Sequence, residues 1–286
     1  RIVNRLGVPM ATAGRLLALA AMVATFTLLW VCFLKARPRA QGLTAMALVA
    51  VFPGSVYYGA IFPISFVTLS MVACLVALDR GRWLLAGMFG MLGALSYPTG
   101  AVLAVVAVVP LVTPTIGPWR IRLRAAVSVA GPILGAYLLV LANFQRAVGR
   151  WDAWFMIQVG YRYHRAWPWE SLVHRLQQLD GHVGPRWPAA QTALVIVMMA
   201  VVGWVTARQW THLRLVERSA AVLVGALWLL PLTVGGDLSL HRAESLLLPA
   251  VILLARSPAR LVGGLAAAAA PVAYSIAGLY TAALII

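Results

Sequence analysis

The chain has 286 residues, of which 62% are hydrophobic and only 10% are charged, and its formal net charge is +16. A soluble globular domain does not need so large an apolar fraction, which argues against a soluble enzyme or binding domain. The arginines stand singly between apolar runs rather than in one basic domain, so no nucleic acid partner is predicted. Cys32 and Cys74 lie in apolar stretches, where cysteine behaves as a small buried hydrophobe.

Apolar runs of about 20 residues are typical of helices that cross a bilayer. Breaks at proline, glycine and arginine clusters divide the chain into ten such segments. They predict an all-α, polytopic integral membrane protein with a single transmembrane domain over residues 1–286. We place the segments at residues 11–34, 43–58, 63–78, 83–96, 98–112, 125–142, 190–207, 219–235, 243–255 and 260–285. Several are shorter than a full span, so some are expected to be tilted or re-entrant.

Basic residues in short loops predict the orientation, because such residues collect on the cytoplasmic side. If the chain starts outside and crosses ten times, thirteen basic residues share the cytoplasmic side: Lys35, Arg37, Arg39, Arg80, Arg82, Arg120, Arg122, Arg124, Arg208, Arg214, Arg218, Arg256 and Arg260. The short loops on the opposite side contain only Arg242. The same count supports a break at Ser96–Gly100, since one long helix over residues 83–112 would put the arginines of "PWRIRLR" outside.

The stretch "FPGSVYYGAIFPIS" (Phe52–Ser65) interrupts the apolar pattern on the outer side with two Phe-Pro steps and two glycines. Proline removes a backbone donor, so such a break needs water or protein around it. We expect Tyr57, Tyr58 and Phe62 to lie in the aromatic belt at the membrane interface. The stretch is either a plain hairpin with aromatic anchors or the wall of a cavity.

A second outer turn, "GGDLSLHRAES" (Gly235–Ser245), brings Asp237, His241, Arg242 and Glu244 to the edge of the following helix. Positions 241 and 244 fall on one helical face. Ionisable residues at this depth are candidates for a functional site. The alternative is a surface ion pair of Arg242 with Asp237 or Glu244.

The only extended hydrophilic stretch, residues 143–189, also falls on the outer side. It predicts two interfacial helices, Trp151–Arg165 and Ser171–Gly181, with glycine ending the second. Such helices can be plain anchors. The alternative is a cationic and aromatic surface that could hold a lipid phosphate and stack on a sugar ring. The residues of this surface are Arg162, His164, Arg165, Trp167 and Trp169.

The stretch Phe52–Gly100 resembles a known family. It is similar to the GT-C membrane glycosyltransferases, closest to the PIG-V type that adds the second mannose to glycosylphosphatidylinositol anchors, and to their bacterial relatives. In that family a Phe-Pro step begins an outer turn, a Tyr-Ser-Glu-Ser-Leu-like motif opens the next helix, and "RGRWLLAG" marks a cytoplasmic hairpin before a Thr-Arg-x-x-Gly-like break. "LHRAESLLLPA" (Leu240–Ala250) is similar to a family step before a Leu-Phe-Pro run.

The chain departs from this family at three places. Phe62 and Ser65 match the helix-opening motif in kind, but Ile64 stands where the family has the acid. "SYPTG" carries Tyr97 where the family has an arginine. The family's catalytic carboxylate lies in the first outer loop, to which nothing here corresponds. The catalytic residue is therefore unknown, and it is expected in an N-terminal helix and loop upstream of Arg1.

The resemblance implies transfer of a sugar, mannose, from a polyprenyl-phosphate donor to an acceptor glycan or glycolipid. It also implies a bacterial plasma membrane, with the active face outside. A carboxylate would act as general base, and cations would stabilise the leaving phosphate. The candidate substrate-binding residues are Arg162, His164, Arg165, Trp167, Trp169, His241, Arg242, Tyr57 and Tyr58.

Other catalytic acids, cofactors and metals receive less support from the sequence. Asp152 and Asp237 are outer acids that could serve as base, but the family's base lies upstream. No cofactor is implied beyond the lipid-linked sugar. No carboxylate or histidine cluster has metal-ligand spacing, so no metal site is predicted, and a need for a divalent metal stays open.

The rival interpretation is a non-catalytic membrane protein derived from that family, either a lipid-binding scaffold or a transporter subunit. Ile64 and Tyr97 favour it, because each replaces a polar residue of the family's pattern. Two observations argue against a transporter. Only Arg15 places a charge near the middle of a predicted span, and no symmetric pair of broken helices is visible.

Overall fold

The computed structural model describes residues 9–160, 167–181, 186–233 and 240–283, and every regular element within these ranges is helical. This confirms the all-α prediction. In chain order the elements are α2 (Met10–Leu29), η1 (Trp30–Leu34), α3 (Arg39–Ala50), α4 (Val56–Gly59), α5 (Ile64–Asp79), α6 (Trp83–Ser96), η2 (Pro98–Ala107), α7 (Val108–Val112), η3 (Pro114–Ile116), α8 (Trp119–Val148), α9 (Ala153–Gly160), α10 (Pro168–Leu176), η4 (Gln177–Asp180), α11 (Arg186–Gln209), η5 (Trp210–His212), α12 (Leu215–Thr233), α13 (Leu240–Ser245), η7 (Leu248–Ala250), α14 (Val251–Leu254) and α15 (Ala259–Thr281).

Within the described residues, five helical stretches are long and apolar enough to cross a membrane, as expected of an integral membrane protein. They are Met10–Leu34, Trp119–Val148, Arg186–His212, Leu215–Thr233 and Ala259–Thr281. Three further apolar stretches are shorter: Ile64–Asp79, Trp83–Ser96 and Pro98–Val112. The predicted count of ten spans is therefore not established, because a bilayer core of about 30 Å needs about 20 helical residues.

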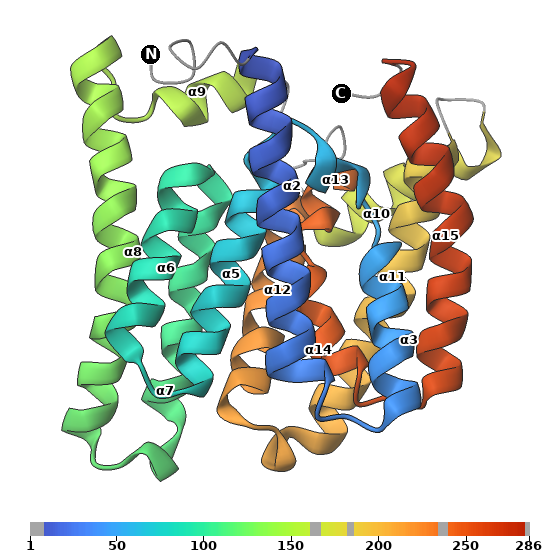
Figure 1. The fold of residues 1–286 in the computed structure, drawn as a ribbon. Coiled ribbons are helices and arrows are strands. Elements are labelled where there is room, and N and C mark those ends of the chain that lie inside the picture. Colours follow the sequence, from blue (N-terminus) through green and yellow to red (C-terminus); the bar gives the residue numbers. More distant parts are fainter. Residues whose placement is uncertain (1–8, 161–166, 182–185, 234–239, 284–286) are drawn as a thin grey trace.

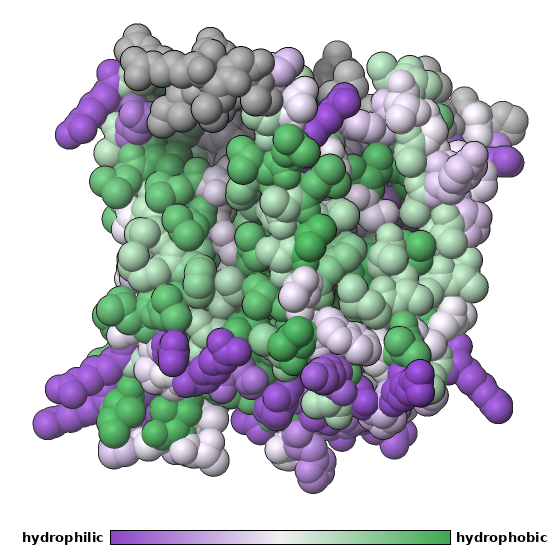
Figure 2. Space-filling view, viewed as in Figure 1, coloured by the Kyte–Doolittle hydropathy of each residue, from purple (hydrophilic) through white to green (hydrophobic). Residues whose placement is uncertain are grey.

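The long helices stand side by side and leave two ends (Figure 1). We call one the basic end; it contains the turns η1–α3, α5–α6, α7–α8, α11–α12 and α14–α15. We call the other the α9 end; it contains α4, α9, α10 and α13. Hydrophilic residues gather along the basic end, at the bottom of Figure 2, and a hydrophobic band separates the two ends.

The chain reverses at the predicted break Ser96–Gly100. α6 ends there because Pro98 cannot continue it, and Tyr97 is extended, with φ −154° and ψ 138°. η2 then packs closely on the last turn of α6. A Cβ at Gly100 would lie 2.1 Å from the Gly93 carbonyl oxygen, so only glycine fits this contact.

α5 is the most enclosed of the three shorter apolar stretches, packed against α2, α6 and α12. Its apolar residues, among them Val67, Met71 and Leu75, are buried in the main core. The hydroxyl of Thr68 donates to the Ile64 carbonyl oxygen at 2.7 Å, which satisfies a polar group inside the bundle. A helix covered by protein on most sides does not need the length or the lipid-facing surface of an outer span.

One buried ion-pair network ties together the loops of the basic end. Both oxygens of Glu217 accept from Arg256, Nε to Oε1 at 2.9 Å and Nη2 to Oε2 at 2.8 Å. Arg37 also donates to Oε1, and the Arg214 backbone N–H donates to Oε2 at 2.7 Å. The third guanidinium nitrogen of Arg256, Nη1, donates to Gln209 Oε1 at 2.8 Å. Glu217 thereby joins the turns η1–α3, α11–α12 and α14–α15.

Candidate functional site

The two outer turns singled out in the sequence meet at the α9 end. Gly54 has φ +76°, and a Cβ there would lie 2.7 Å from Ser245 Cβ and 3.1 Å from the His241 carbonyl oxygen. Glycine at this position therefore serves both the backbone conformation and the close approach. The approach places the turn before α4 directly on α13, although nearly 190 residues separate them in the chain.

The structure corrects the expected place of Tyr57 and Tyr58. Neither lies in an exposed aromatic belt, because both side chains are fully enclosed between the turn and its neighbours. The Tyr58 hydroxyl donates to the Ser245 carbonyl oxygen, and the Ser65 hydroxyl donates to the Tyr58 carbonyl oxygen at 2.6 Å. Tyr58 is thus a structural link between α4 and α13.

Tyr57 is the centre of an aromatic group drawn from three parts of the chain. Its ring centroid lies 5.9 Å from His241, 6.2 Å from Phe62 and 5.8 Å from Tyr280 of α15. The Arg242 guanidinium stands 5.8 Å from the Phe62 ring centroid, a cation–π distance. Of the predicted residues, Tyr57, His241 and Arg242 therefore do come together, while Tyr280 was not predicted.

Beside this group lies a buried carboxylate, Glu244. Gln191 of α11 donates from Nε2 to Glu244 Oε2 at 2.7 Å and to the His241 carbonyl oxygen at 2.8 Å. Within the described part of the chain, Glu244 Oε1 and both ring nitrogens of His241 have no hydrogen-bond partner. Buried polar atoms left in this state are costly and rare in folded proteins, so such a group marks a candidate ligand site.

Positive charge surrounds His241. Arg175 of α10 is buried and donates to Gln178 at 2.8 Å. Burial lowers the pKa of His241, and the nearby charges of Arg175 and Arg242 lower it further. A neutral imidazole offers one donor and one acceptor, which suits a ligand that carries hydroxyl groups.

The remaining predicted residues divide into two groups. Arg162, His164, Arg165 and Asp237 lie outside the described residues. Trp167 and Trp169 are exposed at the start of α10 and stack on each other, with centroids 4.9 Å apart and planes 9° apart.

Helix α10 connects the indole pair to the buried cluster. Its N-terminus is fixed by Glu170, whose Oε2 accepts from the Trp167 backbone N–H at 3.0 Å. Further along the helix, the Ser171 hydroxyl donates to the Leu232 carbonyl oxygen at 2.9 Å, which attaches α10 to α12. The predicted glycine stop also holds, since η4 ends at Gly181 in the left-handed conformation with φ +80°.

The predicted acid Asp152 forms an ion pair with Arg150, two residues before it. Both of its oxygens accept from Arg150, at 3.0 and 2.9 Å. This hydrogen bonding lowers the pKa of Asp152, which makes it a weaker base. Over the described ranges, no group of three or more His, Cys, Asp or Glu side chains could hold a metal ion.

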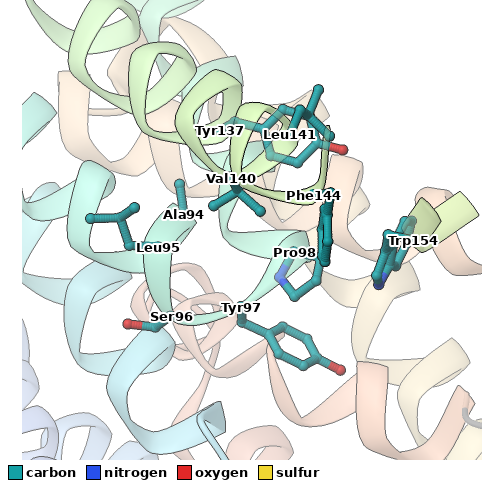
Figure 3. A pocket seen from close by; sticks show the side chains of 10 residues that line it. All are labelled: Ala94, Leu95, Ser96, Tyr97, Pro98, Tyr137, Val140, Leu141, Phe144 and Trp154. Carbon is teal, nitrogen blue, oxygen red and sulfur yellow. The ribbon is translucent and has the colours of Figure 1, made fainter. Parts of the chain in front are cut away.

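The two positions that depart from the family pattern lie in apolar surroundings. Ile64 is fully buried at the start of α5. Tyr97 lines a half-open pocket together with Pro98, Phe144 and Trp154 (Figure 3). Neither position offers a charge to a substrate.

Comparisons with protein-family models, with curated proteins and with solved structures found no match to this chain. The buried cluster at the α9 end is the feature of the described structure that bears on a function.

Proposed function

We propose that the protein takes part in membrane glycosyl transfer, moving mannose from a polyprenyl-phosphate donor to an acceptor glycan or glycolipid. The observation that supports this most is the buried polar cluster at the α9 end, where His241 and Glu244 keep unpartnered polar atoms among the described residues. Sugar hydroxyls both donate and accept hydrogen bonds, so they complement this set. The choice of mannose and of the polyprenyl carrier depends on the family resemblance alone.

In this proposal the ten predicted segments are transmembrane or re-entrant, and the pair at residues 83–96 and 98–112 reverses within the membrane. The basic end faces the cytoplasm, in keeping with the excess of arginine there. The α9 end, with the proposed site, then faces outward from a bacterial plasma membrane.

Each part of the site takes one role. Arg242, with Arg162 and Arg165, neutralises the donor phosphate as its charge grows on departure. His241 and Glu244 hold sugar hydroxyls, and Trp167 and Trp169 stack on the sugar or the prenyl chain. Glu244 is assigned to binding, because in the family that the chain resembles the catalytic carboxylate lies in the first outer loop rather than at this position.

Donor binding provides the test. The purified protein in detergent is titrated with polyprenyl-phosphomannose, with polyprenyl phosphate and with phosphatidylcholine as a control lipid. Saturable binding that prefers the mannosyl compound, and that weakens in Glu244→Gln, supports the proposal. Equal affinity for all three lipids would overturn it.

The second candidate is the non-catalytic lipid-binding protein. The burial of Ile64 and the apolar setting of Tyr97 favour it, since both replace polar family positions. Mannose release or transfer in reconstituted liposomes distinguishes the two. Selective binding without turnover supports the scaffold, and turnover supports the enzyme.

A further inference from the structure

The pocket of Figure 3 exists because two neighbouring helices differ in length. α8 has 30 residues and α6 only 14, so they extend about 45 and 21 Å at 1.5 Å per residue. α8 therefore continues beyond the end of α6, and α9 crosses near its top (Figure 1). Trp154 of α9 faces the resulting step, which Tyr97 and Pro98 close from below (Figure 3).

The wall that α8 contributes is a continuous apolar stripe. Tyr137, Val140, Leu141 and Phe144 follow at helical spacing and face the pocket together. The cavity measures about 200 Å³. Pockets for drug-sized ligands measure about 300–1,000 Å³, so this one is too small for a nucleotide. Its mostly apolar lining suits a segment of hydrocarbon chain better than a sugar.

The position of the pocket along the membrane normal indicates what surrounds it. α6 begins at Trp83, directly after the basic hairpin that carries Arg80 and Arg82. Its length of about 21 Å is less than the hydrocarbon thickness of about 30 Å. The step at the end of α6 therefore lies within the hydrocarbon layer, where lipid chains, not water, are the available occupants.

A positive charge lies at the end of α8, the helix that forms one wall of the pocket. Arg146 is exposed in the last turn of α8, just past Phe144. In the portion of the chain that the structure describes, no carboxylate pairs with Arg146, whereas Arg150 is engaged by Asp152. A chain that enters the pocket from the bilayer would leave its headgroup at the height of this arginine.

We propose that the pocket binds one acyl chain of an anionic phospholipid from the bilayer leaflet at the α9 end, with the phosphate beside Arg146. The occupant is a lipid of the surrounding membrane and not the sugar donor, so the proposal does not depend on glycosyl transfer. Aromatic walls from Tyr97, Tyr137 and Trp154 give the chain a fixed place. A lipid held there would fill the step between α6 and α8.

Two variants on adjacent positions of α8 test the pocket. Val140→Trp fills it, whereas Leu139→Trp adds a similar volume at a position that is 67% exposed and outside the lining. Each protein is reconstituted with phosphatidylglycerol, extracted in mild detergent and weighed by native mass spectrometry. We expect the unaltered chain and Leu139→Trp to retain one phospholipid and Val140→Trp to retain about tenfold less, from the loss of a few buried methylenes.

A second set of measurements keeps the proposal open to refutation. If Val140→Trp aggregates, Val140→Phe, with a smaller side chain, takes its place. Equal retention in the Val140 and Leu139 variants overturns the pocket. A polyprenyl phosphate that displaces phosphatidylglycerol at equal concentration overturns the choice of occupant.

Arg146→Gln tests the headgroup contact. It should lower the preference for phosphatidylglycerol over phosphatidylcholine by about fivefold, and an unchanged preference overturns the headgroup contact.

Discussion

The two ends of the molecule each bury one glutamate, and the hydrogen bonds around the two side chains differ. Glu217 at the basic end and Glu244 at the α9 end are 0% and 1% exposed. Glu217 accepts hydrogen bonds on both oxygens, from two arginine side chains and one backbone N–H. Glu244 accepts from Gln191 on one oxygen, while the Thr192 hydroxyl beside it donates to the Pro188 carbonyl oxygen at 3.3 Å.

This contrast separates a structural carboxylate from a candidate functional one. A buried charge whose oxygens both accept from arginine side chains and a backbone N–H holds loops together and leaves nothing for a ligand. A buried carboxylate with one neutral donor keeps acceptor capacity in reserve. Mutations at the two ends should therefore have effects of different size and kind.

The largest expected effect is on stability at the basic end. Glu217→Gln leaves Arg37 and Arg256 without their shared counter-charge, and we expect the free energy of unfolding to fall by about 3 kcal/mol. Glu244→Gln is the matched substitution at the α9 end, and there the loss should stay below about 1 kcal/mol. Thermal unfolding of both variants in detergent measures the difference. Equal losses would contradict the assignment of separate roles.

The next effect tests the contact between the two outer turns. Gly54→Ala forces a Cβ against Ser245 at 2.7 Å in a left-handed conformation, and we expect a loss of about 2 kcal/mol. Gly59→Ala, at the end of α4, is the control because a Cβ added there would meet no atom within 4 Å. The same unfolding measurement applies. If the two alanine variants are equally stable, α4 and α13 do not pack as described.

A smaller effect is expected on ligand binding. Arg242→Gln removes a cation beside Phe62 and should weaken binding of polyprenyl-phosphomannose about tenfold, or about 1.4 kcal/mol. Arg218→Gln makes the same change at the basic end, where Arg218 donates to the Trp210 carbonyl oxygen. A titration by fluorescence or calorimetry should show unchanged affinity for this control. A loss of affinity in both variants would point to general charge attraction rather than a site.

Local signals in the sequence were enough for the turns and the class of fold. Pro98 ends α6 and Gly181 ends η4 where predicted, because backbone constraints act within a few residues. The site needed contacts that no local pattern encodes. Tyr57 and Tyr58 are buried because they pack against α13, which lies far from them in the sequence.

Gln191 and Tyr280 were not predicted from the sequence for the same reason. Gln191 gave a weak signal as a lone amide near the start of an apolar helix, and Tyr280 gave none. Their importance comes from the neighbours they meet, Glu244 and Tyr57. The span count also depends on packing, since α5 is short yet deeply enclosed by other helices.

The smallest effect is expected at the exposed acid of the α9 end. Asp152 and Arg150 form an exposed pair, and exposed pairs contribute little because water screens them. The hydrogen bond from Arg150 lowers the pKa of Asp152 in the folded chain, so its contribution is present above the unfolded pKa and is lost as pH falls through the folded pKa. Asp152→Asn should therefore leave the unfolding temperature at pH 7 unchanged within error, and should leave donor binding unchanged too. A clear loss of donor binding in this variant would assign the functional carboxylate to Asp152, directly before α9, instead of Glu244. The contrast between the two buried glutamates would then describe packing alone.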